Sequence, residues 1–170
     1  MSRIFDDDYD LSAIIVRPLY FGLVANIVIP VGLLLVCYYL QNSGSVYNRI
    51  GTTANPLFYI FAVLALGEAG LALLLRKKLF SRPMIRRSET FEQDFSDALL
   101  QRSRPIFVLI ASISIYAYIY FLLTGRFTEA VFFVILSFLV FQIVRPRYGL
   151  ARKLIAEQRE LVKQGKFLTD

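Results

Sequence analysis

Residues 106–123 read IFVLIASISIYAYIYFLL, a run without a single charged side chain. An α-helix rises about 1.5 Å per residue, so a run of this length comes close to spanning a hydrocarbon core about 30 Å thick. A strand would leave its backbone N–H and C=O groups unpaired in lipid, whereas a helix pairs them internally. The run therefore predicts a transmembrane helix.

Three further long apolar runs lie on either side of it, at residues 19–40, 57–75 and 127–144. Helices buried in a soluble core are the alternative, but the rest of the chain is too small to cover four of them. We therefore predict an all-α integral membrane protein. Residues 1–170 form one membrane domain, in which four transmembrane helices are arranged as two tandem hairpins.

The composition points the same way. Hydrophobic residues make up 56% of the chain and charged residues 19%, and the mean hydropathy is +0.56. Soluble domains average about 45–50% apolar and about 25% charged residues. This excess of apolar residues excludes an ordinary soluble domain and a disordered chain.

The residue types also exclude several kinds of chemistry. The chain has no His and only one Cys, which rules out Cys/His zinc sites, His-based catalytic triads and internal disulfides. No carboxylate pair, glycine-rich phosphate loop or nucleophile–base set stands out. We expect no enzymatic activity, no metal and no cofactor.

The positions of Lys and Arg predict the orientation in the membrane. All of the 19 basic residues except Arg49 and Arg126 precede the first run, lie between the second and third, or follow the fourth. By the positive-inside rule, these three segments face the cytoplasm. We expect a multi-pass protein of the inner (plasma) membrane with cytoplasmic N- and C-termini. Its basic surfaces suit anionic membrane lipids as partners rather than nucleic acid.

This topology divides the chain into five segments, which alternate between the cytoplasm and the membrane. They are an acidic cytoplasmic leader (1–18), a first hairpin (19–75), a basic cytoplasmic loop (76–105), a second hairpin (106–144) and a basic cytoplasmic tail helix (145–170).

Two short amphipathic helices are expected in the cytoplasmic segments. Phe91, Phe95 and Leu99 repeat every four residues on a polar background, and Ser88 is a suitable N-cap before them. Residues 148–164 have a similar apolar stripe, with Gly165 as a stop. We expect both helices to lie on the membrane surface, and a docking surface for a partner is the alternative.

Prolines mark three places in the runs. Arg17-Pro18 and Arg104-Pro105 stand at the start of the first and third runs, where a helix accepts proline. This likeness leaves open a parallel internal repeat of the two hairpins. Pro30 lies in the middle of the first run and predicts a kink for packing, with a gating hinge as the alternative.

Glu68 is the one ionisable side chain well inside a run. It precedes Arg76 by eight residues, so it lies about 12 Å deep in a helix. A carboxylate at that depth costs at least about 2–3 kcal/mol on insertion scales, so it needs a proton or a donor. A seam of small residues allows a neighbouring helix to approach Glu68. The seam consists of Ala62, Ala65, Ala69 and Ala72, with Gly67 and Gly70 beside it.

Five neutral polar residues in the other three runs are candidate partners for Glu68, because no Lys or Arg lies at its depth. They are Asn26, Ser112, Ser114, Tyr116 and Ser137. Together with Glu68 they form a candidate intramembrane ion or packing site. The open alternatives are a proton or cation carrier, a buried contact with another subunit, and a structural, protonated Glu68.

Two other groups of residues have competing interpretations. Tyr116 and Tyr120 share one face of the third run, with Tyr118 on another face. Helix packing explains them, and a groove for a lipid or a quinone is the alternative. Thr128 and Glu129 are expected to cap the fourth helix and to fill its first turn.

Part of the chain resembles a known family. Residues 114–119 (SIYAYI), residues 121–125 (FLLTG) and residues 65–70 (ALGEAG) are similar to the carboxylate-bearing helix of the rotor-ring proteolipid, subunit c, of rotary ATP synthases. The chain also resembles small four-span bacterial membrane proteins of unknown function with proteolipid-like hairpins. The resemblance implies tandem hairpins and, for Glu68, ion translocation.

These observations predict a small polytopic membrane protein that acts as a non-catalytic accessory or assembly subunit of a larger bioenergetic or transport complex. Its expected partners are membrane lipids and other membrane subunits, or further copies of itself. The alternative is a homo-oligomer that translocates protons or cations with Glu68. A lipid- or quinone-binding subunit is a third hypothesis.

Overall fold

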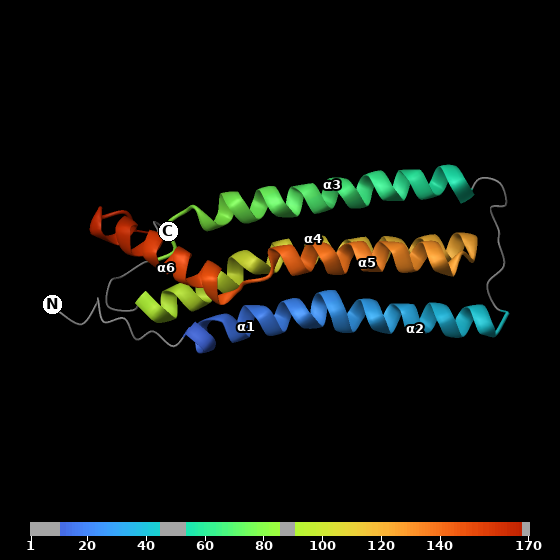
Figure 1. Ribbon diagram of the computed structural model, residues 1–170, viewed down its shortest axis with the longest axis horizontal. Helices are drawn as coiled ribbons and strands as arrows, with labels where there is room; N and C mark the ends of the chain where they lie inside the picture. The colour runs from blue at the N-terminus through green and yellow to red at the C-terminus, as the bar shows by residue number, and fades with distance from the viewer. Residues whose placement is uncertain (1–10, 45–53, 86–90, 168–170) are drawn as a thin grey trace.

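The computed structural model describes residues 11–44, 54–85 and 91–167 of the chain. Within these residues every regular element is a helix. Figure 1 shows long helices lying side by side, with a shorter helix, α6, across one end. Four helical stretches are long and apolar enough to span a membrane: Ile14–Asn42, Asn55–Phe80, Phe91–Thr124 and Phe127–Val144. The prediction of an all-α protein with four membrane-spanning helices is confirmed.

The first span contains a π-turn. Helix α1 (Leu11–Leu23) continues through η1 (Val24–Val28) into α2 (Ile29–Asn42). The N–H of Ile29 bonds to the carbonyl of Val24, five residues back. Pro30 follows at once and has no N–H to donate. The sequence predicted a kink at Pro30, and the structure has a π-turn immediately before that proline.

The second, third and fourth spans are α3 (Ala54–Phe80), α4 (Phe91–Thr124) and α5 (Phe127–Val144). Helices α4 and α5 lie in the middle, with α1–α2 on one side and α3 on the other (Figure 1). The buried share of the most apolar stretch of each helix shows the same arrangement. It is 44% in α4 and 39% in α5, but only 17% in α3. The first hairpin is therefore open, since the second hairpin lies between its two legs.

Helix α1 lies very close to the central pair at Gly22. A Cβ atom on this residue would lie 2.7 Å from a ring carbon of Phe141 and 2.9 Å from a ring carbon of Phe107. Both rings are buried and meet edge to face, with their centroids 5.6 Å apart. The absence of a side chain at Gly22 is therefore what allows α1 to pack here.

Helix α4 differs from the expectation of a separate surface helix followed by a span that starts at Pro105. It runs without a break from Phe91 to Thr124 and includes Pro105. The buried residues Phe91, Phe95 and Leu99 continue along one face into Ile106. Packing along this face outweighs the hydrogen bond that Pro105 cannot make. Pro18 likewise lies inside α1, so neither proline opens its helix. The predicted start at Ser88 lies outside the described residues.

The basic loop predicted over 76–105 is correspondingly shorter, because α3 continues to Phe80 and α4 begins at Phe91. Arg102 holds the segment after α3. Its guanidinium donates to the carbonyl oxygens of Leu79 at 2.5 Å, Arg82 at 2.9 Å and Pro83 at 2.5 Å. These carbonyls lie in the last turn of α3 and just after it, where C=O groups lack intrahelical partners.

Helix α6 (Tyr148–Lys163) covers this end of the bundle (Figure 1). Its face of Ala151, Leu154, Ile155 and Gln158 is buried within the chain. Gln158 accepts a hydrogen bond from the N–H of Met84 at 2.7 Å and donates to the carbonyl of Arg82 at 3.1 Å. The expectation that this apolar face lies on the membrane surface is therefore wrong, because the loop after α3 and the rest of the bundle cover it. Phe91, Phe95 and Leu99 of α4 are also buried within the chain at this end, and not exposed on the membrane surface.

The predicted stop of the tail helix at Gly165 is confirmed. Gly165 has a φ of +70°, a conformation that glycine adopts without steric cost. Its N–H bonds to Val162 O at 3.0 Å, and the N–H of Lys166 bonds to Leu161 O at 2.9 Å. These two bonds are the Schellman pattern that ends many helices.

Candidate functional site

Glu68 lies on α3, at the edge of the seam between α3 and α4. Ala65, Ala69 and Ala72 are buried in this seam. Their small side chains allow the two helices to approach closely, as small residues do between transmembrane helices. Glu68 itself is half-buried. The sequence therefore located the seam correctly, and the structure adds that α4 fills it.

Two residues of α4 contact the Glu68 carboxyl group, one at each oxygen. The Ser112 Oγ lies 2.5 Å from Glu68 Oε2. The Tyr116 hydroxyl donates to Glu68 Oε1. Ser112 and Tyr116 are four residues apart, so they lie on the same face of α4. Glu68 thus joins the peripheral helix α3 to the central helix α4 by polar contacts within the membrane span.

The Ser112 hydroxyl faces two acceptors. The Ser112 Oγ also lies 2.6 Å from the carbonyl oxygen of Leu109. A serine hydroxyl has only one hydrogen to donate, and a carbonyl oxygen has none. Ser112 therefore shares its one hydrogen between Glu68 Oε2 and the carbonyl oxygen of Leu109.

The other three candidate partners do not reach Glu68 in this structure. Asn26 donates through its Nδ2 to Gly22 O at 3.1 Å, and Ser137 donates to Ile110 O at 3.1 Å. The Oγ of Ser114 is buried without a hydrogen-bond partner. All three residues are fully buried. The candidate site of six residues therefore reduces to Glu68, Ser112 and Tyr116.

A second polar cluster, which the sequence analysis did not assemble, lies at the end of the bundle where α4 turns into α5. The Tyr120 hydroxyl donates to Glu129 Oε2. Arg126 Nη1 lies 2.9 Å from Glu129 Oε1 and 2.7 Å from Asn55 Oδ1. Thr124 accepts from the N–H of Arg126 at 3.2 Å. The cluster joins α3, α4 and α5.

Glu129 lies in the first turn of α5, as predicted. The predicted cap at Thr128 is wrong, because the helix begins at Phe127, with Arg126 at the N-cap position. A sequence signal for the second cluster did exist. Hydroxyl side chains recur every four residues along α4, at Ser112, Tyr116, Tyr120 and Thr124.

The tyrosines of this face do not line an open groove. The Tyr120 side chain is fully buried, and its ring packs against Phe58, Phe61 and Phe133 with centroids 5.9–6.2 Å apart. The Tyr116 ring packs against Phe61 at 5.7 Å. These contacts favour the packing interpretation of Tyr116 and Tyr120 over a quinone groove.

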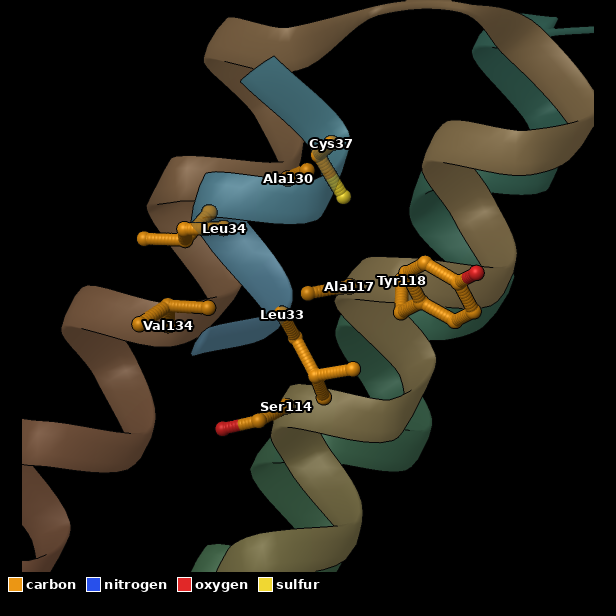
Figure 2. Close-up of a pocket in the computed structure, with 8 residues that line it drawn as sticks. All are labelled: Leu33, Leu34, Cys37, Ser114, Ala117, Tyr118, Ala130 and Val134. Atoms are coloured by element: carbon orange, nitrogen blue, oxygen red, sulfur yellow. The ribbon is translucent and has the colours of Figure 1, made fainter. Parts of the chain in front are cut away.

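Figure 2 shows a different space, between α2, α4 and α5, which includes Cys37, Ser114 and Tyr118 in its lining. Its empty volume is about 150 Å³, but it has no room for a water molecule. The lining is mostly aliphatic, with Leu33, Leu34 and Val134 among its residues. We interpret it as imperfect packing between helices and not as a ligand site.

Among the described residues no group of three or more His, Cys, Asp or Glu could hold a metal ion. Comparison of the chain with protein-family models, with curated proteins and with solved structures finds no match. Any assignment of function therefore depends on the geometry of the chain itself.

Proposed function

We propose that the protein is a non-catalytic accessory or assembly subunit of a larger membrane complex, and that the uncovered face of α3 binds a transmembrane helix of a partner subunit. We further propose that it lies in the inner (plasma) membrane with the α6 end in the cytoplasm. The positive-inside rule supports this orientation, since the described Lys and Arg except Arg126 belong to segments at or near the α6 end.

The observation that carries this proposal is that α3 has small residues on two opposite faces. One face, with Ala65, Ala69 and Ala72, packs on α4. Residues 63, 67, 70 and 74 recur at helical spacing on the other side of α3, and they are Val63, Gly67, Gly70 and Leu74. All four are exposed, and a Cβ atom at either glycine would meet nothing within 4 Å.

This outer stripe, Val63–Gly67–Gly70–Leu74, has the features of a helix-packing surface in a membrane. Two glycines flanked by larger apolar residues allow a second helix to come close, because the contact is then made by backbone and Cα atoms. Glycine also weakens a helix by about 0.5–1 kcal/mol relative to alanine. Within the described part of the chain nothing packs against either glycine, whereas a partner helix on this stripe would use both of them for close packing.

The proposal predicts that bulky side chains on the outer stripe abolish partner binding while the fold of the free chain persists. We expect Gly67→Leu/Gly70→Leu to lose the chains that co-purify with the wild-type protein after gentle solubilisation. The fold persists because both positions open onto empty space. Quantitative mass spectrometry of affinity-purified samples measures the loss.

Gly32→Leu is the matched control. Gly32 is an exposed glycine of the first span, and a Cβ atom there would also meet nothing within 4 Å. We expect this variant to retain its partners. Equal recovery of partners with Gly67→Leu/Gly70→Leu and with the wild type would contradict the proposed contact face.

The second candidate function is translocation of protons or cations by a homo-oligomer. The contacts of Ser112 and Tyr116 with Glu68 favour it, because they provide a defined, half-buried carboxyl site within the span. Intramembrane carboxylates commonly mark ion pathways.

This candidate predicts that Glu68→Gln abolishes proton or Na⁺ flux in proteoliposomes of the purified protein, because glutamine neither releases a proton nor carries a charge. Ser114→Ala is the control, since Ser114 is buried away from Glu68. A wild-type flux no greater than that of protein-free vesicles would rule this function out for the isolated chain.

A further inference from the structure

The surroundings of Glu68 differ strongly in the two directions along the α3–α4 interface. Towards the end of the bundle at Arg126, α4 has a hydroxyl group at every turn, at Ser112, Tyr116, Tyr120 and Thr124. We call this set the hydroxyl row. Its spacing of four residues puts its members on one face of the helix, about 6 Å apart along the axis.

In the other direction the same interface is apolar. Residues 69–75 of α3 read AGLALLL, and residues 105–111 of α4 read PIFVLIA. Neither segment has a side chain that donates or accepts a hydrogen bond. Towards the α6 end, the next such side chains are Arg76 on α3 and Arg104 on α4. A proton on Glu68 therefore has no side-chain carrier on these helices between its own position and the α6 end.

The hydroxyl row ends in groups that reach water. Tyr120 donates to Glu129, which is paired with Arg126 at 2.9 Å. The side chains of Glu129 and Arg126 are 30% and 35% exposed, respectively. Glu129 can therefore exchange a proton with the aqueous phase, and Tyr120 connects it to the interior of the bundle.

The step between Tyr116 and Tyr120 on this route runs beside the ring of Phe61. Both rings pack against Phe61, at 5.7 and 6.2 Å between centroids. The two tyrosines are one helical turn apart on the same face of α4. Tyr116 is half-buried whereas Tyr120 is fully buried. The transfer therefore requires the Tyr116 hydroxyl to turn from Glu68 toward Tyr120.

We infer that Glu68 exchanges its proton with the water at the Arg126 end of the bundle, through Tyr116, Tyr120 and Glu129, and not with the water at the α6 end. Only hydrogen nuclei move. The Tyr116 hydroxyl, which donates to Glu68 in the structure, first turns toward Tyr120. Its oxygen then accepts the proton of Glu68 as it releases its own to Tyr120, and Tyr120 releases its proton to Glu129. Glu68 ends as a carboxylate, and Glu129 takes up the proton and passes it to water.

The groups that face Glu68 make this route specific. Helix α4 presents Ser112 and Tyr116 to it, and α5, which also packs against α3, has Glu129 as its only titratable group. The route needs no partner subunit and no net flux, so it goes beyond the proposed role of the protein and can be tested on the free chain.

The test uses purified protein reconstituted in one orientation into phosphatidylcholine vesicles, with the pH set separately on each side. A hydrophobic carbodiimide, which reacts with protonated carboxyl groups, is added from the membrane phase, and modification of Glu68 is measured by mass spectrometry. We expect labelling to fall promptly when the pH is raised at the Arg126 end. Raising the pH at the α6 end should have no effect on the same time scale.

Three variants link this response to the route. We expect Tyr120→Phe and Glu129→Gln to slow the response on the order of a hundredfold, the low end of what a positioned proton donor contributes. Tyr118→Phe should respond like the wild type, because Tyr118 lies off the hydroxyl row and lines the space between α2, α4 and α5. Circular dichroism and thermal unfolding identify any variant that fails to fold. If Tyr120→Phe fails to fold, Glu129→Gln alone tests the route.

Several results would overturn the inference. They are a response to pH at the α6 end, an equally fast response from both ends, and a wild-type rate in both folded route variants. Glu68 that labels at no pH from either side would also overturn it. None of these results affects the proposed subunit role, which depends on the outer stripe of α3 and is measured by partner recovery.

Discussion

Arg102→Ala is expected to lower the free energy of unfolding by about 3 kcal/mol, among the largest effects of any single substitution in the chain. Arg102 donates to three backbone carbonyls, those of Leu79, Arg82 and Pro83, at 2.5–2.9 Å. Hydrogen bonds from a charged donor contribute more than neutral ones, and removing the donor leaves partly buried acceptors without a partner. Thermal or denaturant unfolding in detergent micelles measures the loss.

Two further variants separate the geometry of Arg102 from its charge. Arg102→Lys keeps the charge but cannot present the planar fork that reaches three carbonyls, so we expect it to recover only part of the stability. Arg104→Ala removes a neighbouring, exposed cation whose guanidinium lies 5.8 Å from the centre of the Phe21 ring. Such a contact contributes about 0.5–1 kcal/mol. Equal losses in Arg102→Ala and Arg104→Ala would contradict the role of Arg102.

Gly22→Leu is expected to destabilise the protein by about 2–3 kcal/mol through overpacking. A Cβ atom at Gly22 already comes within 2.9 Å of the Phe107 and Phe141 rings, and a leucine adds three more carbon atoms. The two rings cannot easily move aside, because both are buried and pack against each other. The substitution therefore pushes α1 away from α4 and α5. Unfolding in micelles measures its effect.

Gly32→Leu in the same span is the control for this prediction. Gly32 has no atoms near its Cβ position, and leucine is a better helix former than glycine by up to about 1 kcal/mol. We expect it to leave stability unchanged or slightly raised. Similar destabilisation at both positions would show that glycine matters in this span for a reason other than close packing.

The four spans were predictable because membrane insertion places a simple demand on a sequence. About 20 predominantly apolar residues have one structure that satisfies their backbone in lipid. Residues 57–75, in which Glu68 is the one acidic or basic side chain, lie well within α3 for this reason. Which spans lie in the centre was not predictable. All four are predominantly apolar. The structure shows the outer helices meeting the central pair at the close approach of Gly22 and at the seam of Ala65, Ala69 and Ala72.

The failures at the α6 end have one physical cause. Phe91, Phe95 and Leu99 form an apolar stripe whether they face lipid or protein, so the stripe alone does not show what covers it. Helix α4 packs against α1, while α6 packs against α1 and is joined through Gln158 to the segment around Met84.

The candidate site was predictable only in part. Depth alone selected Ser112, Ser114 and Tyr116 together, but Ser114 is two residues from Ser112 and so lies on another face of α4. The second cluster depends on the turn between α4 and α5. Gly125, with a φ of +70°, reverses the chain and brings Glu129 back beside Tyr120. A contact across such a turn is not visible in the spacing of a single helix.

The central claim is that this chain works as a subunit of a larger membrane assembly. The most direct test is the native mass of the gently solubilised protein at its natural level of expression, with every co-purifying chain identified by mass spectrometry. We predict a complex that contains other membrane proteins, crosslinked to the outer stripe of α3. A free chain, or a closed homo-oligomer without foreign chains, would contradict the claim. The homo-oligomer would make Glu68 and ion conduction the question to pursue.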